Sequence, residues 1–275
     1  MEKRNDIKFW NEFWNKHKEI SLDEGPDTWY MLVWKVGLEY WSDIFNRLSP
    51  GKKMLECGAG SAKVSLYMAK QGYSCVMLDN SDDGLNPGKI NFKKANINGE
   101  FVLGDVEKLP FEEGTFDIVY SGGLLHHFHD IHPAVKEMIR VLKPDGLFAA
   151  TVITKKFSCQ TLGDIQIFWA KFARHLVKGE IKGIVKRSRR NFPFYENSIS
   201  LKEYKKIAEE SGLKNVVATG NSPFPAIALP QFLHPVYAKF MKMFMPCWKW
   251  FNNSDSKFTE IWGATFSIYG IKKKM

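Results

Sequence analysis

Short apolar segments alternate with longer amphipathic segments from Lys52 onward, and this alternation restricts the possible folds more than any other feature. The short segments have the length of strands and the longer ones the length of helices. Strands separated by helices form parallel crossovers, so the pattern predicts an open, doubly wound α/β sheet with helices on both faces. The predicted strands lie within residues 52–60, 73–81, 100–111, 115–123 and 145–154, with helices at 61–72, 89–99 and 132–142.

The composition fits a globular chain with a sizeable core. The 275 residues are 44% hydrophobic and 25% charged, which one α/β domain with insertions can accommodate. The four cysteines form no CxxC pair, which argues against a zinc ribbon or disulfide framework and favours a reducing compartment. The N-terminus has no apolar signal-peptide core, and no stretch approaches 18 uncharged apolar residues. We therefore expect a cytoplasmic protein, with attachment to a membrane surface as an open alternative.

The net charge of +9 is concentrated in two segments. Residues 155–190 contain ten Lys or Arg and two acidic residues, and residues 231–275 contain seven Lys and two acidic residues. The remainder of the chain is mildly acidic. The basic charge is therefore a property of particular segments and not of the whole surface.

Aromatic residues are abundant before residue 50 and recur with helical spacing, at positions 10, 13 and 14 and at positions 30, 34 and 41. Gly25 and Pro26 separate the two groups, so we predict two helices that form an N-terminal cap over residues 1–50. Such a cap either packs as core or closes over a ligand. Four aromatic residues are candidates for an acceptor pocket on this basis: Trp10, Trp14, Trp29 and Tyr30.

Acidic residues and glycines follow the predicted strands. Because ligands of open α/β sheets bind outside the carboxyl ends of the strands, these residues are candidates for a cofactor site. They are Glu56, Gly58 and Gly60 after the first strand, Asp79 and Asn80 after the second, Asp105 and Val106 after the third, and Ser121 and Gly122 after the fourth.

The chemistry of this rim favours a nucleoside without phosphates. Lys63 stands where a dinucleotide fingerprint has its third glycine, and Glu56 would repel a diphosphate but suits a cationic group. Asp79 lies where a carboxylate accepts hydrogen bonds from ribose hydroxyls. Asp105 can accept from the adenine amine, with the Val106 amide facing a ring nitrogen. Adenine, ribose and an ammonium-bearing tail together describe S-adenosylmethionine.

Five ordered segments resemble class I S-adenosylmethionine-dependent methyltransferases: ECGAG, Asp79, GDVEKLPF, FDIVYSGGLLHHF and VLKPDGLF, within residues 52–154. The LLHHF element is similar to the branch that contains ubiquinone and menaquinone C-methyltransferases. The resemblance implies a Rossmann-like, seven-stranded sheet whose last strand is antiparallel. It places the sixth strand at 213–220, after a helix at 200–212, and the last at 265–273.

This framework divides the chain into the cap (1–50), the cofactor-binding core (51–154), a basic helical insertion over the active site (155–199), and the C-terminal part of the core (200–275). A second, aromatic and basic insertion occupies about 220–262 within the last part. Both insertions follow strands that run parallel to the first, so both leave from the cofactor edge of the sheet. Long insertions at such an edge are more often functional than neutral.

Methyl transfer is an in-line displacement for which the protein mainly aligns the reactants and excludes water. His126 follows the fourth strand and is our candidate general base, with a purely structural role as the alternative. We expect the adjacent His127 to face the core and His129 to lie near the acceptor. We expect no metal, because Pro133 makes residues 126–132 a loop without the regular spacing of ligands.

The acceptor is predicted to be a small, hydrophobic or amphipathic molecule with an O, N or C nucleophile. Residues 229–251 are apolar and aromatic with interspersed lysines, which suits either a lid or a segment at the surface of an anionic membrane with a lipid or quinone acceptor. No nucleic-acid-binding module is recognisable. A catalytically silent S-adenosylmethionine-binding partner subunit is the remaining alternative, and the oligomeric state stays open.

Overall fold

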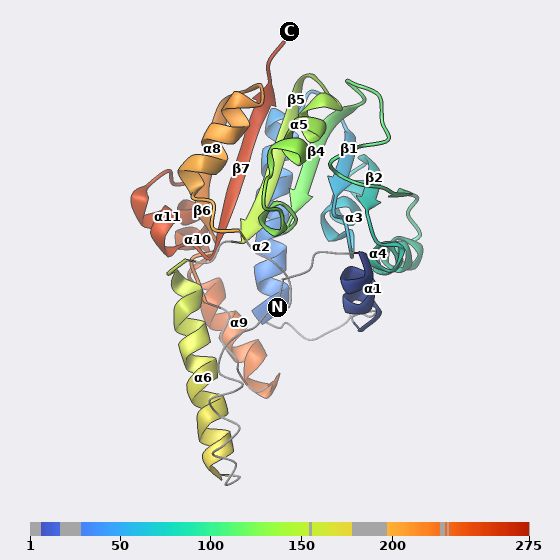
Figure 1. The fold of residues 1–275 in the computed structure, drawn as a ribbon. Helices are drawn as coiled ribbons and strands as arrows, with labels where there is room; N and C mark the ends of the chain where they lie inside the picture. The colour runs from blue at the N-terminus through green and yellow to red at the C-terminus, as the bar shows by residue number, and fades with distance from the viewer. Residues whose placement is uncertain are drawn as a thin grey trace.

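The computed structural model describes residues 7–16, 29–153, 156–177, 197–225, 229 and 231–274. Its centre is a seven-stranded sheet in the order β3-β2-β1-β4-β5-β7-β6, in which β7 is antiparallel to both β5 and β6 (Figure 1). The strands are β1 Lys53–Cys57, β2 Ser74–Asp79, β3 Glu100–Leu103, β4 Phe116–Gly122, β5 Leu142–Ile153, β6 Leu213–Asn221 and β7 Thr265–Lys272. The α-helices are α1 Ile7–Lys16, α2 Trp29–Leu48, α3 Lys63–Ala69, α4 Asp82–Lys94, α5 His132–Arg140, α6 Cys159–Val177, α8 Leu201–Glu210, α9 His234–Lys242, α10 Met245–Asn252 and α11 Lys257–Trp262. Two 3₁₀ turns are η1 Leu125–His127 and η3 Gln231–Leu233.

The doubly wound sheet and its antiparallel last strand are confirmed. Helix α4 differs from the prediction, because it begins at Asp82 and not at residue 89. The Ser81 side chain caps this helix by accepting a hydrogen bond from the Gly84 amide at 2.9 Å. Two acidic residues in the first turn favour the same start, since they lie at the positive end of the helix dipole.

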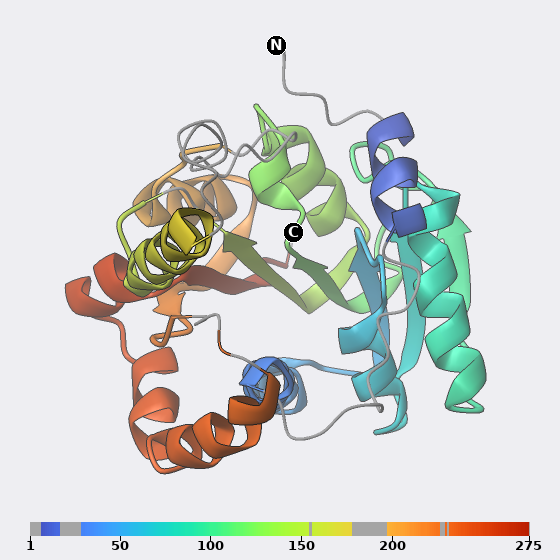
Figure 2. The same ribbon diagram turned by 90° about the horizontal axis from the view of Figure 1, so that it is seen from below.

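Helices cover both faces of the sheet (Figure 2). On one face α5 and α8 pack against alternate residues of β1, β2, β4 and β5, represented by Leu55, Val119 and Phe148. On the other face α2, α3 and α4 pack against the residues between them, represented by Met54 and Ile118. This strict alternation decides which strand residues can face a ligand at the end of the sheet.

Helix α2 belongs to two environments. Its C-terminal half lies against the sheet, where Trp41 and Phe45 are buried and pack on the Tyr120 ring at centroid distances of 5.3 and 5.8 Å. Its N-terminal half packs against α9 and α10, through Leu32 and Val36. The second helix of the predicted cap is thus also one of the layers that cover the sheet.

The parallel strands all end at one edge of the sheet, the lower edge in Figure 1. Helix α6 follows β5, and the segment η3–α11 follows β6, so both insertions leave the sheet at this edge. The basic residues 178–190 lie outside the described residues. None of the helices in the described ranges combines the length and the hydropathy that crossing a bilayer requires.

Candidate functional site

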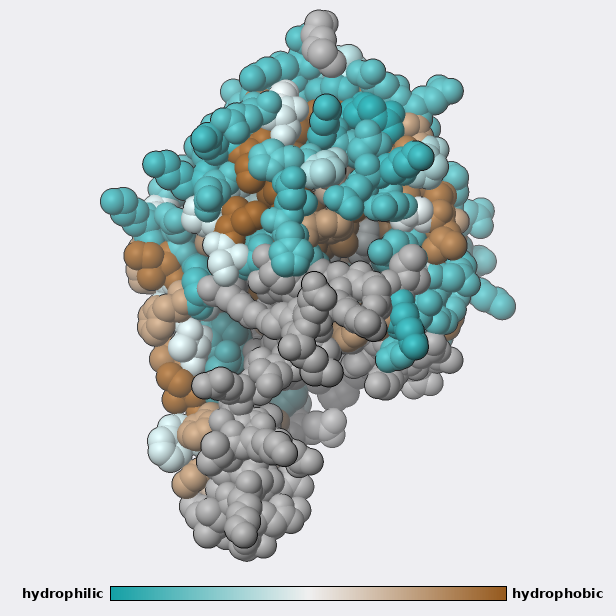
Figure 3. Space-filling model, viewed as in Figure 1, coloured by the Kyte–Doolittle hydropathy of each residue, from teal (hydrophilic) through white to brown (hydrophobic). Residues whose placement is uncertain are grey.

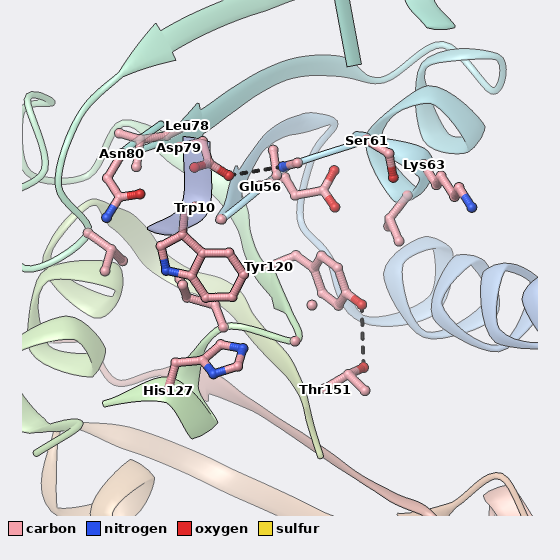
Figure 4. Close-up of a pocket in the computed structure, with 18 of the residues that line it drawn as sticks. Trp10, Glu56, Ser61, Lys63, Leu78, Asp79, Asn80, Tyr120, His127 and Thr151 are labelled. Atoms are coloured by element: carbon pink, nitrogen blue, oxygen red, sulfur yellow. Dashed lines mark hydrogen bonds between the residues drawn. The ribbon is translucent and has the colours of Figure 1, made fainter. Parts of the chain in front are cut away.

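A cavity of about 750 Å³ opens at the carboxyl ends of β1, β2 and β4. Strand ends and their loops form its floor, while α1, α2 and α3 contribute residues to its walls (Figure 4). Eight of the nine predicted cofactor residues line it: Glu56, Gly58, Gly60, Asp79, Asn80, Asp105, Val106 and Gly122.

The turn after β1 needs its glycines. Gly58 and Gly60 have φ angles of +67° and +48°, which L side chains rarely adopt. The amides of Gly58 and Ala59 both donate to the Leu78 carbonyl, at 2.8 and 3.0 Å, which ties the turn to β2. The loop is therefore a fixed backbone surface along one side of the cavity.

Asp79 is held by the same loop. Its carboxylate accepts hydrogen bonds from the backbone amides of Gly60 (3.1 Å) and Ser81 (3.0 Å), and the residue is only 8% exposed. Burial raises the pKa of this carboxyl, and the amide hydrogen bonds act against that rise. Asp79 is thus a rigid acceptor whose lone pairs not used by the amides are available to the cavity.

Glu56 lies deeper, at the end of β1, and is 5% exposed. Its carboxylate accepts a hydrogen bond from the Ser65 amide of α3 at 2.9 Å. Burial raises the pKa of Glu56 to about 7, and the neighbouring charge of Asp79 contributes in the same direction. A cation placed in the cavity would relieve this cost of ionisation.

The opposite end of the cavity is more open. Asn80 and Asp105 are exposed and Val106 is buried. Asp105 accepts a hydrogen bond from the Glu107 amide at 2.9 Å, which fixes the loop that follows β3. The cavity therefore runs from an exposed polar end at Asn80 and Asp105 to a buried end at Glu56.

A tyrosine that the sequence analysis did not single out stands beside Glu56. Tyr120 on β4 is paired in register with Glu56, so both side chains point to the α2 face of the sheet. The Tyr120 hydroxyl lies 3.3 Å from the Thr151 hydroxyl, which also accepts a hydrogen bond from the Trp41 indole at 3.0 Å. The strand period would have identified Tyr120, because it lies two residues before Gly122 on the same face.

Lys63 is a second lining residue with no predicted role. Its ammonium lies 4.0 Å from the centroid of the Trp34 ring of α2, and the residue is 8% exposed. Burial lowers the pKa of Lys63 to about 8. Within the described part of the chain, no carboxylate forms an ion pair with it. Lys63 thus brings a positive charge to the α2 side of the cavity, and its side chain extends away from Glu56 toward α2 (Figure 4).

Helix α1 places two indoles in the cavity wall. The Trp10 ring packs edge-on against the His127 ring, with 5.0 Å between the ring centroids. The Trp14 ring lies so close to Gly60 that a Cβ atom at that position would collide with it. Asn11 of the same helix is hydrogen-bonded to Ser81. Both tryptophans therefore line the cavity, and their role in binding an acceptor remains a prediction.

The assignment of the two histidines is wrong. His127, and not His126, lines the cavity. His126 is 2% exposed, its Nδ1 accepts a hydrogen bond from the Ile153 amide at 3.4 Å, and burial lowers its pKa to about 3. The error arose because residues 125–127 form a 3₁₀ turn, in which the spacing of residues alone does not fix which side chain reaches the cavity; the two imidazole rings lie only 4.0 Å apart between centroids.

Two further predicted residues do not line the cavity. Ser121 is fully buried on the other face of the sheet, and its hydroxyl has no hydrogen-bond partner among the described residues. His129 is exposed beyond η1. The side chains of Trp29 and Tyr30 lie outside the described residues, so their predicted role remains a prediction.

The charges of the cavity fit the predicted cofactor. Four carboxylates and a single ammonium are found among the described lining residues: Glu56, Asp79, Asp105, Glu107 and Lys63. This set would repel a diphosphate, whereas it offers acceptors to ribose, to an exocyclic amine and to an ammonium or sulfonium group. No group of three or more potential metal ligands occurs within the described ranges.

Comparison of the sequence with known proteins also indicates a methyltransferase. A family model described as a methyltransferase domain matches residues 55–150. An uncharacterized methyltransferase of Synechocystis is 38% identical over 104 residues, which are 37% of this chain and 47% of that protein. A demethylmenaquinone methyltransferase of Mycolicibacterium gilvum is 31% identical over 172 residues, 60% of this chain and 69% of that protein. The chain spans less than half the length of the first curated relatives that it matches.

Solved structures share the fold over nearly the whole chain. A putative sarcosine dimethylglycine methyltransferase from Galdieria sulphuraria superimposes with a TM-score of 0.55 at 18% identity, over 97% of this chain and 98% of that one. A possible histamine N-methyltransferase from Thermotoga maritima gives a TM-score of 0.54 at 15% identity, over 97% and 99%. At these identities the likeness concerns the fold alone.

Proposed function

The chain belongs to the family of S-adenosylmethionine-dependent methyltransferases, and from this premise we propose that it methylates a small, hydrophobic or amphipathic acceptor. One observation carries the proposal. The acidic strand ends predicted to hold an adenosine line a single cavity, together with apolar and aromatic side chains.

The proposed roles of the cofactor residues follow the length of the cavity. Asp79 accepts from the ribose hydroxyls, and Asn80, Asp105 and Val106 surround the adenine. At the buried end, Glu56 receives the ammonium of the amino acid tail and Lys63 its carboxylate, so that two opposite charges match a zwitterion. When bound, the cofactor supplies an electrophilic methyl group on a sulfonium, and the protein chiefly aligns the acceptor and excludes water.

The apolar lining of the cavity suits an apolar acceptor. Leu124, Phe128 and Ile153 line the cavity, as do the indoles of Trp10 and Trp34. Aromatic faces can also stabilise a positive charge that develops near them. The named activity of the M. gilvum relative, on a demethylmenaquinone, is consistent with an acceptor of this class.

His127 is the proposed proton acceptor, where the acceptor molecule must lose a proton. It lies at the cavity wall next to Trp10, whereas His126 is enclosed in the protein. We expect His127→Ala to lower kcat by about 100-fold, the lower limit for a general base, while cofactor affinity changes less than about twofold. His127→Gln separates loss of the base from loss of packing. An unchanged kcat in both variants would show that His127 only shapes the pocket.

Methyl-labelled S-adenosylmethionine, incubated with the full chain and a metabolite extract, tests the proposed activity. We expect label to appear in a small apolar product, and the same extract without the protein gives the background. Calorimetry with S-adenosylhomocysteine is run in parallel. Binding without any labelled product would favour the silent partner subunit over the enzyme.

A further inference from the structure

Large apolar side chains are exposed mainly on the two insertions. Of seventeen such side chains among the described residues, thirteen lie in segments 157–169 and 232–261. Scattered exposed apolar residues are normal on a protein surface, but a concentration of this kind marks an interaction site. The thirteen are Phe157, Leu162, Ile165, Trp169, Phe232, Leu233, Val236, Phe240, Met243, Phe244, Trp250, Phe258 and Ile261.

The residues around α9 are arranged in two opposite stripes. His234, Ala238 and Met241 are buried at i, i+4 and i+7, and Met241 packs with residues of α2 and α10. Val236, Phe240 and Met243 have the same spacing two residues later, which places them on the opposite side of the helix. With Phe232 of η3, these three form what we call the α9 stripe, whose members are 52–76% exposed. The helix thus has one face that packs against α2 and α10 and one apolar face that is exposed, on which the Phe240 ring contacts the Phe244 ring.

Positive charge accompanies the α9 stripe. Lys239, Lys242 and Lys249 are all exposed, and residues 231–253 contain no Asp or Glu. Some lysines elsewhere on the described surface form ion pairs, as Lys89 does with Asp82. An apolar stripe flanked by exposed lysines is complementary to a surface that is apolar inside and anionic outside.

Helix α6 presents a similar face at the same edge of the molecule. Leu162, Ile165 and Trp169 are exposed at i, i+3 and i+7, and α6 projects beyond the carboxyl edge of the sheet together with α9 (Figure 1). In the same view, hydrophobic residues follow the left margin over α11 and α6, while the upper part of the molecule is mostly hydrophilic (Figure 3). The apolar side chains therefore gather at the end of the molecule that holds the cavity.

We propose that the α9 stripe and its three lysines bind the surface of an anionic lipid bilayer, with the apolar side chains among the acyl chains and the lysines at the headgroups. Because no described helix is able to cross a bilayer, the segment lies in the interface. A symmetric dimer through the same stripe is disfavoured, since it would bring the lysines of both copies together without a carboxylate. If the proposed function holds, an apolar acceptor reaches the cavity from the lipid phase.

Vesicle flotation of the full chain tests the docking surface without any reference to methyl transfer. We expect the protein to float with mixed phosphatidylcholine and phosphatidylglycerol vesicles at low salt, and with less of it bound at high salt. Vesicles of pure phosphatidylcholine should bind far less of the protein. Equal binding to both vesicle types, or to neither, would overturn the proposal.

Matched variants locate the surface. Lys239, Lys242 and Lys249 changed together to Gln should weaken binding by about 100-fold, because each lysine near an anionic surface contributes roughly fivefold. The charge-matched control changes three other exposed lysines, Lys70 directly after α3 and Lys93 and Lys94 of α4, and should have no comparable effect. Equal losses in the two triple variants would show that only net charge matters and would contradict the assignment.

A second pair of variants tests the apolar part. Phe240→Glu with Met243→Glu should abolish flotation, whereas Ile90→Glu with Leu103→Glu, at exposed positions on α4 and β3, should not. S-adenosylhomocysteine affinity, measured on the same variants, reports the cofactor site separately. If the free protein is a dimer that only Phe240→Glu with Met243→Glu dissociates, the stripe binds a second copy and the bilayer proposal is wrong.

Discussion

Residues 52–153 bury nearly all of their large apolar side chains, whereas the insertions after β5 and β6 expose many of theirs. Both regions are rich in aromatic and aliphatic residues, so apolar content does not separate them. What differs is the neighbourhood: strands and helices of the core present apolar residues to two packed layers, while α6 and α9 each have one face that no other described element covers. The first arrangement stabilises a fold, and the second is available for binding.

Truncation of a side chain should show this difference most strongly. Phe45 is fully buried against Tyr120, so Phe45→Ala should lower the free energy of unfolding by about 3–5 kcal/mol. Trp250 is larger but exposed, and Trp250→Ala should change the stability by less than about 0.5 kcal/mol. Urea denaturation of both variants measures the contrast. Similar losses would mean that α10 is packed more tightly than the structure shows.

The pH dependence of stability should reveal the buried acid in the core. Glu56 has a folded-state pKa of about 7, raised by burial above its ordinary value near 4.5. The stability that this shift represents, about 3 kcal/mol at most, is present below the ordinary pKa and is lost as the pH rises through 7. Stability curves of the wild type and of Glu56→Gln should therefore diverge between about pH 5 and pH 8. Parallel curves would show that Glu56 is not held in a desolvated site.

Cofactor affinity should depend on the core and not on the insertions. Asp79→Ala should weaken S-adenosylhomocysteine binding by about 2–3 kcal/mol, or about 30- to 150-fold, through loss of charge-assisted hydrogen bonds. Glu112→Ala, an exposed acid beyond β3, is the control, and Phe240→Glu should also leave the affinity unchanged. Calorimetry decides the point, and an unaltered affinity in Asp79→Ala would refute the ribose assignment.

Lys63 should have a smaller and more selective effect. Lys63→Met should lower the affinity for S-adenosylhomocysteine by about tenfold, the loss expected for one charge-assisted contact. Binding of 5′-methylthioadenosine, which lacks the amino acid group, should not change. Lys53→Met is a matched control, because the Lys53 ammonium also lies over a ring, that of Phe116 at 5.3 Å, on the amino-terminal side of β1. Equal losses for the two ligands would remove Lys63 from the tail site.

The core was predictable because its signals are local. The alternation of strands and helices follows from burial on two faces, and acidic residues at the ends of parallel strands necessarily meet at one edge of the sheet. Ser121 was wrongly predicted as a cofactor residue. Side chains alternate between the two faces of a strand, so if Tyr120 faces the cavity, the adjacent Ser121 faces away from it. The exchange of His126 and His127 has another cause, since the direction of side chains in a 3₁₀ turn depends on how the following segments pack. The Asn197 side chain donates to the Leu125 and Phe128 carbonyls, a contact across about seventy residues that no spacing reveals.

The part of the site on α2 and α3 was less predictable, because it also depends on a contact between segments that are distant in sequence. Trp34 and Lys63 meet because α2 and α3 lie on one face of the sheet, and their separation in sequence carries no hint of this contact. The position of the insertions followed from the order of the strands. Which of their faces would remain exposed did not, because it depends on the packing of α9 against α2.

A calorimetric titration of the full chain with S-adenosylhomocysteine, compared with ADP and NAD, tests the central claim most directly. If the carboxylates of the cavity are arranged around a phosphate-free adenosine with a zwitterionic tail, S-adenosylhomocysteine binds at one site and the two diphosphates do not compete. Tight binding of either diphosphate at the same site, or the absence of any S-adenosylhomocysteine binding, would contradict the account.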